Sequence, residues 1–366
     1  MWQYLKQSLQ RFDWVLFSSV LLLACFGLVE IYSIALGQGS QNFLNFKKQV
    51  LFICLGVPLL FIFSFIDWRI FKSFYRYLYF LGVAILGVVL LVGQTIRGTK
   101  GWFYIGGFGI QPVEFIKIVL IIFLASFFSR VSAKVRPWKY FFLSGISSAF
   151  LMFLVLMQPD FGSALILFSI WLFMLIFVGF NRKYFLIIAL AGIIAFAGSW
   201  FFFFKDYQKQ RILTFLNPTR NSLKDGYNIS QAIIAVGSGN IMGRGVGFGS
   251  QSQLKFLPEA QNDFIFAVIS EELGIMGVFL VFLFYGVLFF RCFMAVRQSN
   301  DDFPIFFILG VVGLIFVEMF INIGMNIGIM PVVGISLPFV SYGGSSILAS
   351  FIMIGIIENM IIRSKA

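Results

Sequence analysis

Histidine is absent from this sequence of 366 residues, and acidic residues are few, with 15 Asp and Glu against 27 Lys and Arg. Without histidine the chain cannot build a Ser-His-Asp nucleophile, a His-ligated zinc site or a histidine proton shuttle. Any acid–base chemistry must therefore use carboxylates, lysine, tyrosine or water. The cysteines show no paired spacing, so neither a disulfide framework nor a thiolate metal motif is predicted. They are Cys25, Cys54 and Cys292.

Charged residues are also scarce. They make up only 11% of the chain, against about 25% in an average soluble protein, while 60% of the residues are hydrophobic and the mean hydropathy is +0.95. Apolar stretches of at least about 18 residues recur along the whole chain, which is typical of a polytopic membrane protein. The first stretch, residues 14–36, is too long for a signal-peptide core and lacks a small-residue cleavage site, so we expect it to remain as a membrane helix.

The apolar stretches predict an all-α polytopic membrane protein, with about ten transmembrane helices in a single membrane domain, residues 1–366. One large hydrophilic loop, residues 205–262, separates the seventh helix from the eighth. The ten helices are predicted over residues 14–36, 49–66, 74–93, 112–129, 139–157, 162–179, 184–204, 263–290, 304–328 and 339–362.

Basic residues indicate the orientation of the helices, because Lys and Arg collect on the cytoplasmic side of a membrane protein. With the N-terminus inside, the inner segments hold 15 of the 27 basic residues and the short outer loops hold four. Both termini are therefore predicted to be cytoplasmic, and the loop 205–262 to be extracytoplasmic. The net charge of +12 follows largely from this bias. No basic and aromatic module predicts a nucleic-acid partner.

The large outer loop is rich in glycine and in basic residues. Its length favours a functional or separately folded segment, although its composition is equally compatible with a flexible loop. Its glycines permit tight turns or close approach to a ligand, but no Gly-Lys-Ser/Thr follows, so a P-loop is not predicted. Arg211, with Lys205, Lys209 and Lys255, could receive a lipid phosphate, because a guanidinium donates two hydrogen bonds to phosphate oxygens. Attraction to lipid head groups explains the lysines equally well.

Ionisable residues inside apolar stretches cost about 2.5 to 3.5 kcal/mol each on insertion and are therefore candidates for function. QPVEFIKIVL places Glu114 and Lys117 three residues apart on one helix face, where they are expected to pair. The pair either fixes helix packing or lines a polar cavity that substrate reaches. Glu318 lies near Asn322 and Asn326 at helical spacing, and such Asn side chains more often join helices than catalyse.

Two other polar stretches border predicted helices. LMQPDFGSA places Asp160 in a Pro-Asp-Phe-Gly turn, where turn chemistry is the simpler interpretation and substrate contact the alternative. GISLPFVSYGGSSIL begins the last predicted helix with many small and polar residues, among them Ser341 and Gly343. That composition indicates either a broken helix facing a cavity or a notch for close helix packing.

FLPEAQNDFIFAV contains Glu259 and Asp263 at the junction between the outer loop and the eighth predicted helix. Asp263 fits an N-cap or first-turn residue, because the positive end of the helix dipole stabilises an acidic side chain. It also fits a general base, since a carboxylate at the membrane surface can accept a proton from a sugar hydroxyl. The local sequence leaves both interpretations open.

Six motifs, taken together, resemble the SEDS family (shape, elongation, division and sporulation), in particular its RodA-like members. In chain order they are QPVEFIKI, QPDFGSA, RILTFLNP, GYNISQAIIAVGSG, GSQSQLKFLPEAQNDFIFAVISEELG and GIMPVVGISLPFVSYGGSS. Each motif is weakly specific, whereas all six in order over the whole chain are highly specific. Two positions depart from the family: Gly101 stands where an Arg often precedes the Trp, and Asn262 replaces the Thr common before the essential Asp.

The resemblance implies a peptidoglycan glycosyltransferase of the bacterial cytoplasmic membrane that polymerises lipid II for cell-wall elongation and cell shape. It implies that Asp263 activates the 4-hydroxyl of the acceptor GlcNAc for inverting attack on the lipid-linked donor MurNAc, with release of undecaprenyl pyrophosphate. Glu114 would position Lys117, and Glu259 would belong to the loop structure or make a secondary polar contact. The expected substrate-binding residues are Glu114, Lys117, Arg211, Lys100, Asp160, Ser341 and Gly343.

The expected partners are a class B penicillin-binding transpeptidase, lipid II and membrane lipids. No metal site is readable from the sequence, and a divalent cation remains possible. Two alternatives stay open: a transporter of a lipid-linked precursor, which would depend on Glu114 and Glu318, and a scaffold that only recruits a transpeptidase. A polymerase would instead depend on Asp263.

Overall fold

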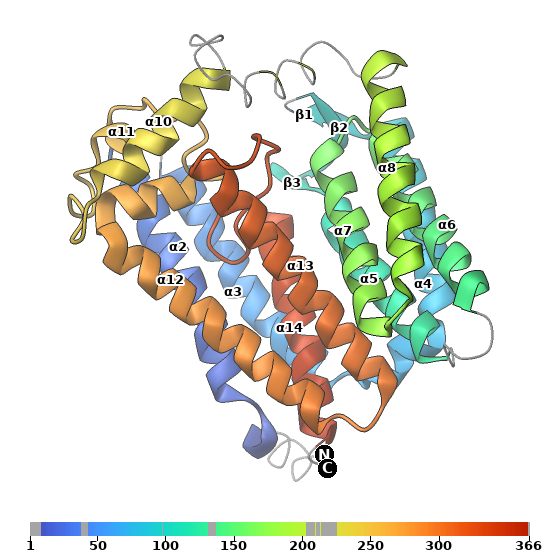
Figure 1. Cartoon of the computed structure of the whole chain (residues 1–366). Coiled ribbons are helices and arrows are strands. Elements are labelled where there is room, and N and C mark those ends of the chain that lie inside the picture. Colours follow the sequence, from blue (N-terminus) through green and yellow to red (C-terminus); the bar gives the residue numbers. More distant parts are fainter. Residues whose placement is uncertain are drawn as a thin grey trace.

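The structure is a computed structural model, and it describes residues 9–37, 43–96, 98–130, 137–202, 209, 213 and 225–364. In this part of the chain the fold is a bundle of long helices with a small sheet and two further helices at one end (Figure 1). The long helices are α2 (Trp14–Gly37), α3 (Leu44–Phe65), α4 (Trp68–Val92), α5 (Val113–Ser129), α6 (Pro137–Leu156), α7 (Phe161–Val178), α8 (Arg182–Phe202), α12 (Ile265–Gln298), α13 (Asp302–Asn326) and α14 (Gly344–Ser364).

These helices confirm the predicted polytopic helical fold, and each predicted span corresponds to one of them. A helix satisfies its own backbone hydrogen bonds, which is the requirement for crossing lipid. Within the described residues, eight helices are long and apolar enough to cross a membrane. The other two predicted spans correspond to α5, which has 17 residues, and α8.

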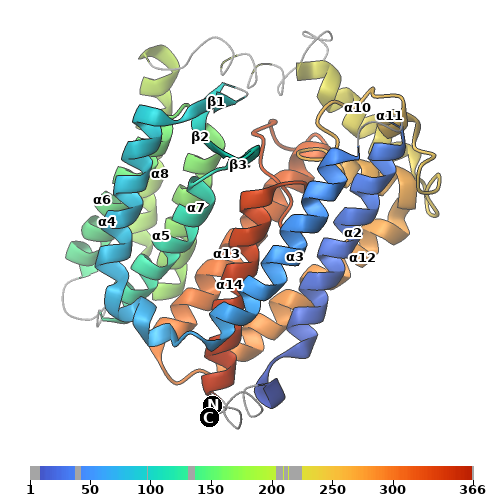
Figure 2. The same cartoon turned by 180° about the vertical axis from the view of Figure 1, so that it is seen from behind.

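Helices α13 and α14 form the centre of the bundle and are the most buried of the candidate membrane helices. Helix α14 packs on α3, α12 packs on α2, and α13 packs on both α5 and α7. Figures 1 and 2 show α2, α3 and α12 on one side of this pair and α4, α6 and α8 on the other. Large side chains such as Phe303, Phe307 and Phe351 fill the interior. A residue on α13 or α14 can therefore contact both halves of the bundle.

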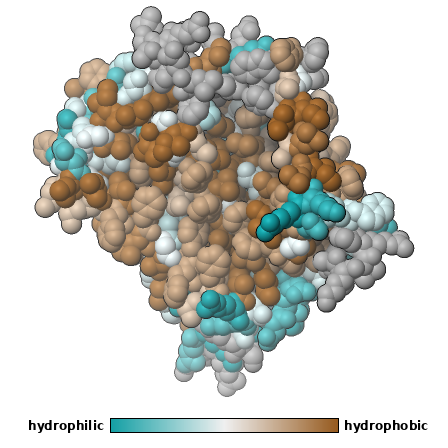
Figure 3. All heavy atoms as spheres, in the orientation of Figure 1, coloured by the Kyte–Doolittle hydropathy of each residue, from teal (hydrophilic) through white to brown (hydrophobic). Residues whose placement is uncertain are grey.

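The outer surface of the bundle is apolar. Exposed side chains on α4 include Leu91 and Tyr77, which are 81% and 73% exposed. On the face shown in Figure 3, brown side chains cover most of the bundle, and teal ones gather mainly at the lower end and the right edge. Apolar surface of this extent matches a hydrocarbon environment rather than water.

The start of α2 and the end of α14 lie at the same end of the bundle (Figure 1). The backbone N–H of Asp13, just before α2, donates to Glu358 in the last turns of α14 at 3.0 Å. The carboxylate of Asp13 accepts from Nε of Arg291, on α12, at 2.8 Å. The even number of crossings that the sequence predicted agrees with this arrangement. We call this the terminal end of the bundle and the other the site end.

A small antiparallel sheet at the site end was not predicted from the sequence. It lies between α4 and α5, in the strand order β1 (Gln94–Ile96), β2 (Thr99–Ile105), β3 (Phe108–Ile110). Strands β2 and β3 are joined through Gly106 and Gly107, whose φ angles of 59° and 84° suit a two-residue hairpin turn. The dipeptide Gly-Gly between apolar residues is the sequence signal for this hairpin.

The described part of the long hydrophilic loop, residues 205–262, folds back onto α12. It contains α10 (Asp225–Ser238) and α11 (Ser250–Gln253), joined by a glycine-rich loop, residues 239–249. Two fully buried carboxylates on α12 hold it. Glu271 accepts from the backbone N–H of Gln251 at 2.8 Å, and Glu272 accepts from that of Gly247 at 3.0 Å. The sequence analysis did not assign a role to either glutamate.

Glycines let this loop lie directly against α12. A Cβ added at Gly239 would lie 1.7 Å from the carbonyl oxygen of Ser270, which no side chain permits. Gly274 interrupts α12 with a φ of 64°, and there the N–H of Ile275 donates to the carbonyl of Asn240 at 3.0 Å. The close approach expected of these glycines is therefore an approach to α12.

Candidate active site

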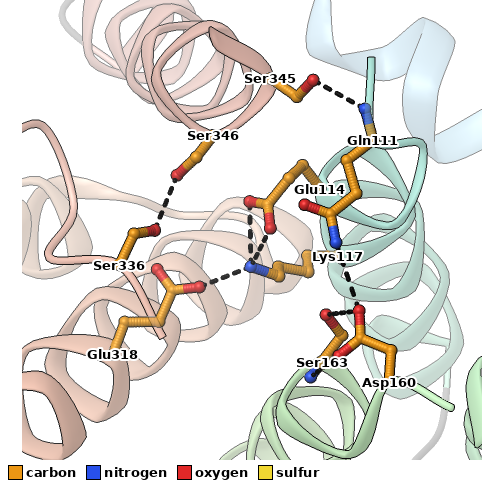
Figure 4. A network of polar contacts seen from close by, with 9 residues as sticks. All are labelled: Gln111, Glu114, Lys117, Asp160, Ser163, Glu318, Ser336, Ser345 and Ser346. Atoms are coloured by element: carbon orange, nitrogen blue, oxygen red, sulfur yellow. Dashed lines mark hydrogen bonds and ion pairs between the residues drawn. The ribbon is translucent and has the colours of Figure 1, made fainter. Parts of the chain in front are cut away.

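A buried ion cluster joins α5 to α13. Nζ of Lys117 lies 2.8 and 2.9 Å from the carboxylate oxygens of Glu114 and 2.7 Å from Oε1 of Glu318. Lys117 and Glu318 are each only 5% exposed. Figure 4 shows the three side chains pointing toward one another between the two helices. The expected pairing of Glu114 with Lys117 is confirmed, and the sequence analysis missed Glu318 as its third member.

The cluster places two carboxyl groups around one ammonium group, which is one carboxyl group more than a simple ion pair has. An ammonium group has three N–H donors, and here the three contacts are shared by the two glutamates. Burial of charges is tolerated when they are paired and hydrogen-bonded, as they are here. The arrangement fixes α5 against α13 and also places a cation inside the bundle.

Asp160 caps the start of a helix, as the Pro-Asp-Phe-Gly turn predicted. It is the N-cap of α7, and its side chain accepts from the backbone N–H of Ser163 at 2.9 Å. The same carboxylate accepts from Nε2 of Gln111, which precedes α5, at 3.2 Å. The backbone N–H of Gln111 donates in turn to Oγ of Ser345, on α14, at 2.8 Å. The starts of α5, α7 and α14 are therefore linked (Figure 4).

Lys100 lies on β2 beside the segment that precedes α7. Its backbone N–H donates to the carbonyl of Gln158 at 3.1 Å, and its Nζ lies 3.4 Å from the carbonyl of Leu91 at the end of α4. Gly101 is buried, and a Cβ there would lie 3.3 Å from the side-chain oxygen of Gln158. The structure thus places the ammonium of Lys100 at the carboxyl end of α4.

Asp263 is half-buried and lies just before α12, at the site end. The sequence left two interpretations of Asp263 open. Because the N-cap of α12 is Phe264, the interpretation as an N-cap or first-turn residue is wrong. Its carboxylate faces the segment that precedes α14, since a Cβ added at Gly334 would lie 3.6 Å from Oδ2. The two-residue shift of the helix start removes Asp263 from the helical backbone.

Three consecutive backbone carbonyls hold the segment that carries Asp263. The carbonyl of Gln261 accepts from the N–H of Tyr342 at 2.8 Å, and the carbonyl of Asn262 accepts from Oγ of Ser341 at 2.7 Å. The carbonyl of Asp263 accepts from Nδ2 of both Asn322 and Asn326, described below. We call this set of contacts the carbonyl clamp. It fixes the backbone of Asp263 before any substrate binds.

Ser341 and Gly343 take part in the same framework. The hydroxyl of Ser341 accepts from the backbone N–H of Leu337 at 2.8 Å while it donates to Asn262. The N–H of Gly343 donates to Oε1 of Gln49, on α3, at 3.3 Å. The residues before α14 are irregular backbone bound to neighbouring helices, as a broken helix would be. Substrate contact by either residue stays a prediction.

Asn322 and Asn326 complete the clamp. Their Nδ2 atoms donate to the carbonyl of Asp263 at 3.1 and 2.9 Å. The interpretation as a hydrogen-bonding group between helices is confirmed for Asn326, whose Oδ1 accepts from Ala267 of α12, whereas Asn322 bonds the segments that precede α12 and α14. Glu318, Asn322 and Asn326 follow one another at four-residue spacing on one face of α13, about 6 Å apart along the axis. The ion cluster therefore lies one turn below the residue that holds Asp263.

The remaining predicted residues are placed as follows. Glu259 accepts from Nδ2 of Asn262 at 2.7 Å, which matches its expected role in loop structure. Arg211 and Lys205 lie outside the described residues. Among the residues that the structure describes, no group of three or more Cys, Asp or Glu side chains could hold a metal ion.

The sequence matches the family described as "Cell cycle protein" (FtsW, RodA and SpoVE) over residues 13–366. It is 34% identical over 357 residues to stage V sporulation protein E of Bacillus subtilis, a match that covers 95% of this chain and 96% of that protein. It is 32% identical over 374 residues to the probable peptidoglycan glycosyltransferase FtsW of Geobacter metallireducens, covering 98% and 97% of the two chains.

Solved structures share the fold. One chain, from a study of how a peptidoglycan synthase complex coordinates polymerization and crosslinking, superposes with a TM-score of 0.81 at 27% identity and covers 96% of this chain and 98% of that one. The rod-shape-determining protein RodA of Thermus thermophilus superposes with a TM-score of 0.71 at 26% identity, covering 96% and 97%. RodA has also been solved with an aspartate replaced by alanine. With family motifs, sequence match and fold in agreement, this chain belongs to the FtsW/RodA/SpoVE family, which is the SEDS family.

Proposed function

We propose that this chain is a peptidoglycan glycosyltransferase that polymerises lipid II into β-1,4-linked glycan strands at the outer face of the cytoplasmic membrane. The observation that carries the proposal is the setting of Asp263, a half-buried carboxylate outside α12 whose backbone is fixed by the carbonyl clamp. A related FtsW is named a probable peptidoglycan glycosyltransferase, and a structural neighbour comes from a peptidoglycan synthase complex.

Asp263 is the proposed general base. Its carboxylate accepts the proton of the acceptor GlcNAc 4-hydroxyl as that oxygen attacks the anomeric carbon of the donor MurNAc. The new C–O bond forms as the bond to the pyrophosphate oxygen breaks, and undecaprenyl pyrophosphate leaves with the electron pair. Attack opposite the leaving group inverts the α-linked donor to a β linkage. Asp263 then releases its proton to water.

Lys117 is the proposed source of positive charge for the departing pyrophosphate, with Arg211 and Lys100 as further cations. Because its three N–H donors are shared by Glu114 and Glu318, a phosphate oxygen would have to replace one carboxylate contact. Glu114 holds Lys117 in place until then. Asp160, Ser341 and Gly343 would shape the walls, since their polar groups already bind neighbouring segments.

A class B penicillin-binding transpeptidase is the proposed partner, which would crosslink the strand as it emerges. The structural neighbour from a complex that couples polymerization to crosslinking supports this choice. Both termini would be cytoplasmic, so the site end would face the outside, where lipid II is consumed. Cell-wall elongation is the proposed process, on the RodA-like wording of the motifs.

The test uses purified protein in detergent with fluorescent lipid II, with and without the transpeptidase and a divalent cation. Glycan ladders on a gel are expected from the wild type. Asp263→Ala and the isosteric Asp263→Asn should lower the rate at least about 100-fold, because a positioned base contributes about that much. Ladders of wild-type length and rate from a folded Asp263→Asn protein would disprove the proposed base.

Transport of a lipid-linked precursor is the second candidate, and the observation that favours it is the charge cluster buried inside the bundle. Vesicles that carry labelled lipid II distinguish the two. A transporter would move lipid II with Asp263→Ala and lose that movement when Glu114 or Glu318 is replaced. A polymerase would make ladders that depend on Asp263.

A further inference from the structure

We infer that Asn326 and Asn322 are positioning residues for the reaction, which hold Asp263 outside α12 and set the direction of its carboxylate. This inference rests on the proposed function, because it concerns the base of that reaction. It assigns a task to two asparagines that touch no reacting atom. Both are fully buried at the site end of α13.

Asn326 replaces a hydrogen bond that would otherwise extend the helix. If α12 began at Asp263, the N–H of Ala267 would donate to the carbonyl of Asp263 four residues earlier. Instead, Oδ1 of Asn326 accepts from the N–H of Ala267 at 3.1 Å, and Nδ2 of Asn326 donates to the carbonyl of Asp263 at 2.9 Å. One side chain therefore bonds both members of that pair, which do not bond each other. The N–H of Ala267 also donates to the carbonyl of Phe264, at 3.1 Å.

The start of α12 supplies no side-chain cap of its own. The N-cap of α12 is Phe264, whose side chain cannot accept a hydrogen bond, and no acidic residue lies in the first turn. Asn326 thus supplies a cap from another helix. Because Asp263 is outside the helical turns, its side chain is not confined to the directions that a helix allows.

Asn322 ties the same carbonyl to the segment that faces the carboxylate. Its Nδ2 donates to the carbonyl of Asp263 at 3.1 Å and to that of Ile335 at 2.8 Å. Gly334, next to Ile335, is the residue that Oδ2 of Asp263 faces. Asn322 therefore sets the spacing between the base and the wall opposite to it.

Helix α13 also carries Glu318, the partner of Lys117, one turn below Asn322. The proposed base and the proposed cation are consequently held by three side chains of one rigid helix. Reaction rates depend steeply on such spacing, because a displacement of about 1 Å can lower a rate about 100-fold. The expected defect from a loosened clamp is in turnover and not in substrate affinity.

Asn359 provides a matched control at the terminal end. It is 1% exposed and lies on α14, where its Nδ2 donates to the carbonyl of Ser64 at 2.8 Å and its Oδ1 accepts from the N–H of Trp68 at 3.0 Å. It thus bridges a carbonyl and an N–H four residues apart, as Asn326 does. A substitution of Asn359 removes the same kind of hydrogen bond, at a position remote from Asp263.

The experiment compares Asn326→Asp with Asn359→Asp in the lipid II assay, with melting temperatures measured in parallel. Each change keeps the acceptor and replaces the amide NH2, which has two donor hydrogens, with a carboxyl oxygen that carries one at most. At Asn326 that oxygen faces the carbonyls of Asp263 and Asn322, and at Asn359 it faces that of Ser64. Both variants should melt at similarly lowered temperatures, but only Asn326→Asp should lower kcat, by about 10- to 100-fold, with KM unchanged. Equal kcat in the two variants, or a defect confined to KM, would overturn the inference.

Asn322→Ala keeps the test decisive if Asn326→Asp does not fold. It removes one of the two donors to Asp263 and leaves the bridge made by Asn326, so we expect a folded protein with kcat lowered about 3- to 10-fold. A wild-type kcat in that variant would refute positioning by Asn322. Failure of the proposed function is recognised separately, since the wild type would then make no ladders, or Asp263→Asn would make them normally.

Discussion

Lys117 is the residue at which packing and chemistry must be separated. Its ammonium is buried against Glu114 and Glu318, so a single substitution changes both the charge balance of the bundle and the electrostatic field near the site. Removing one partner of a buried ion pair typically costs about 3 to 5 kcal/mol, because an uncompensated charge is left behind. Loss of activity alone would therefore not reveal what Lys117 does.

Lys117→Ala should be strongly destabilised, since it leaves two buried carboxylates facing each other. Lys117→Arg keeps the charge and should be milder, although the guanidinium has a different shape. The melting temperature in detergent and the yield of folded protein measure both effects. An alanine variant as stable as the wild type would contradict the ion cluster seen here.

Replacing the whole cluster distinguishes a packing element from a cation that serves the reaction. Lys117→Met combined with Glu114→Gln and Glu318→Gln removes every charge at similar volume, and buried ion pairs exchanged in this way often keep or gain stability. We expect a folded protein with little polymerisation in the lipid II assay. Recovery of activity along with stability would assign the cluster to helix packing alone.

Residue spacing predicted some of these contacts and not others. The three-residue spacing of Glu114 and Lys117 was sufficient to predict their ion pair, because both residues lie on one helix. The spacing of Asn322 and Asn326 fixed their common face but not their partner, which is a carbonyl 59 and 63 residues away. The position of Asp263 was harder to predict, because a capping hydrogen bond from a side chain of a different helix leaves no signal in the local sequence.

At the scale of elements, the glycine-rich loop is attached to α12 by backbone contact. Gly239 permits that contact, whereas Gly237, two residues earlier on α10, has no atom within 4 Å of an added Cβ. The two carboxylates of Glu271 and Glu272 then bind the backbone N–H groups beyond it. A buried carboxylate that accepts from several N–H groups holds a loop more firmly than neutral hydrogen bonds do.

Gly239→Ala should therefore separate the loop from α12, at a cost of about 1 to 3 kcal/mol for the forced displacement. Gly237→Ala is the matched control and should leave stability unchanged within about 1 kcal/mol, since it adds a methyl group in open space. Hydrogen exchange of residues 239–253 should rise in the first variant only. Equal protection of the loop in both would argue against the backbone contact.

The sequence predicted the long elements better than the short ones. Ten apolar stretches are long enough for hydropathy alone to predict a buried or membrane-spanning helix, and a helix is found at each of them. Gly106 and Gly107 are the sequence signal for the hairpin of β2 and β3, but the apolar residues around them hide that signal. Binding of the loop by Glu271 and Glu272 could not be foreseen, because it depends on how distant segments meet.

At the scale of the whole molecule, the ion pair near the two termini and the candidate active site lie at opposite ends of the bundle. The terminal end joins Asp13 to Arg291 and Glu358, while the site end holds the carbonyl clamp and the sheet. The most buried helices, α13 and α14, run between the two ends. Asp263 can act on a substrate presented outside the cell only if the terminal end is cytoplasmic.

Single cysteines test that orientation in cells. After Cys25, Cys54 and Cys292 are replaced, Tyr104→Cys would place an exposed thiol on the sheet at the site end, and Asp301→Cys would place one between α12 and α13 at the terminal end. A membrane-impermeant thiol reagent should label the first in intact cells and the second only after permeabilisation. The excess of basic residues on the terminal side predicts this pattern, since Lys and Arg stay in the cytoplasm. The reverse pattern would put Asp263 inside the cell, where a polymerase of outer-leaflet lipid II could not use it.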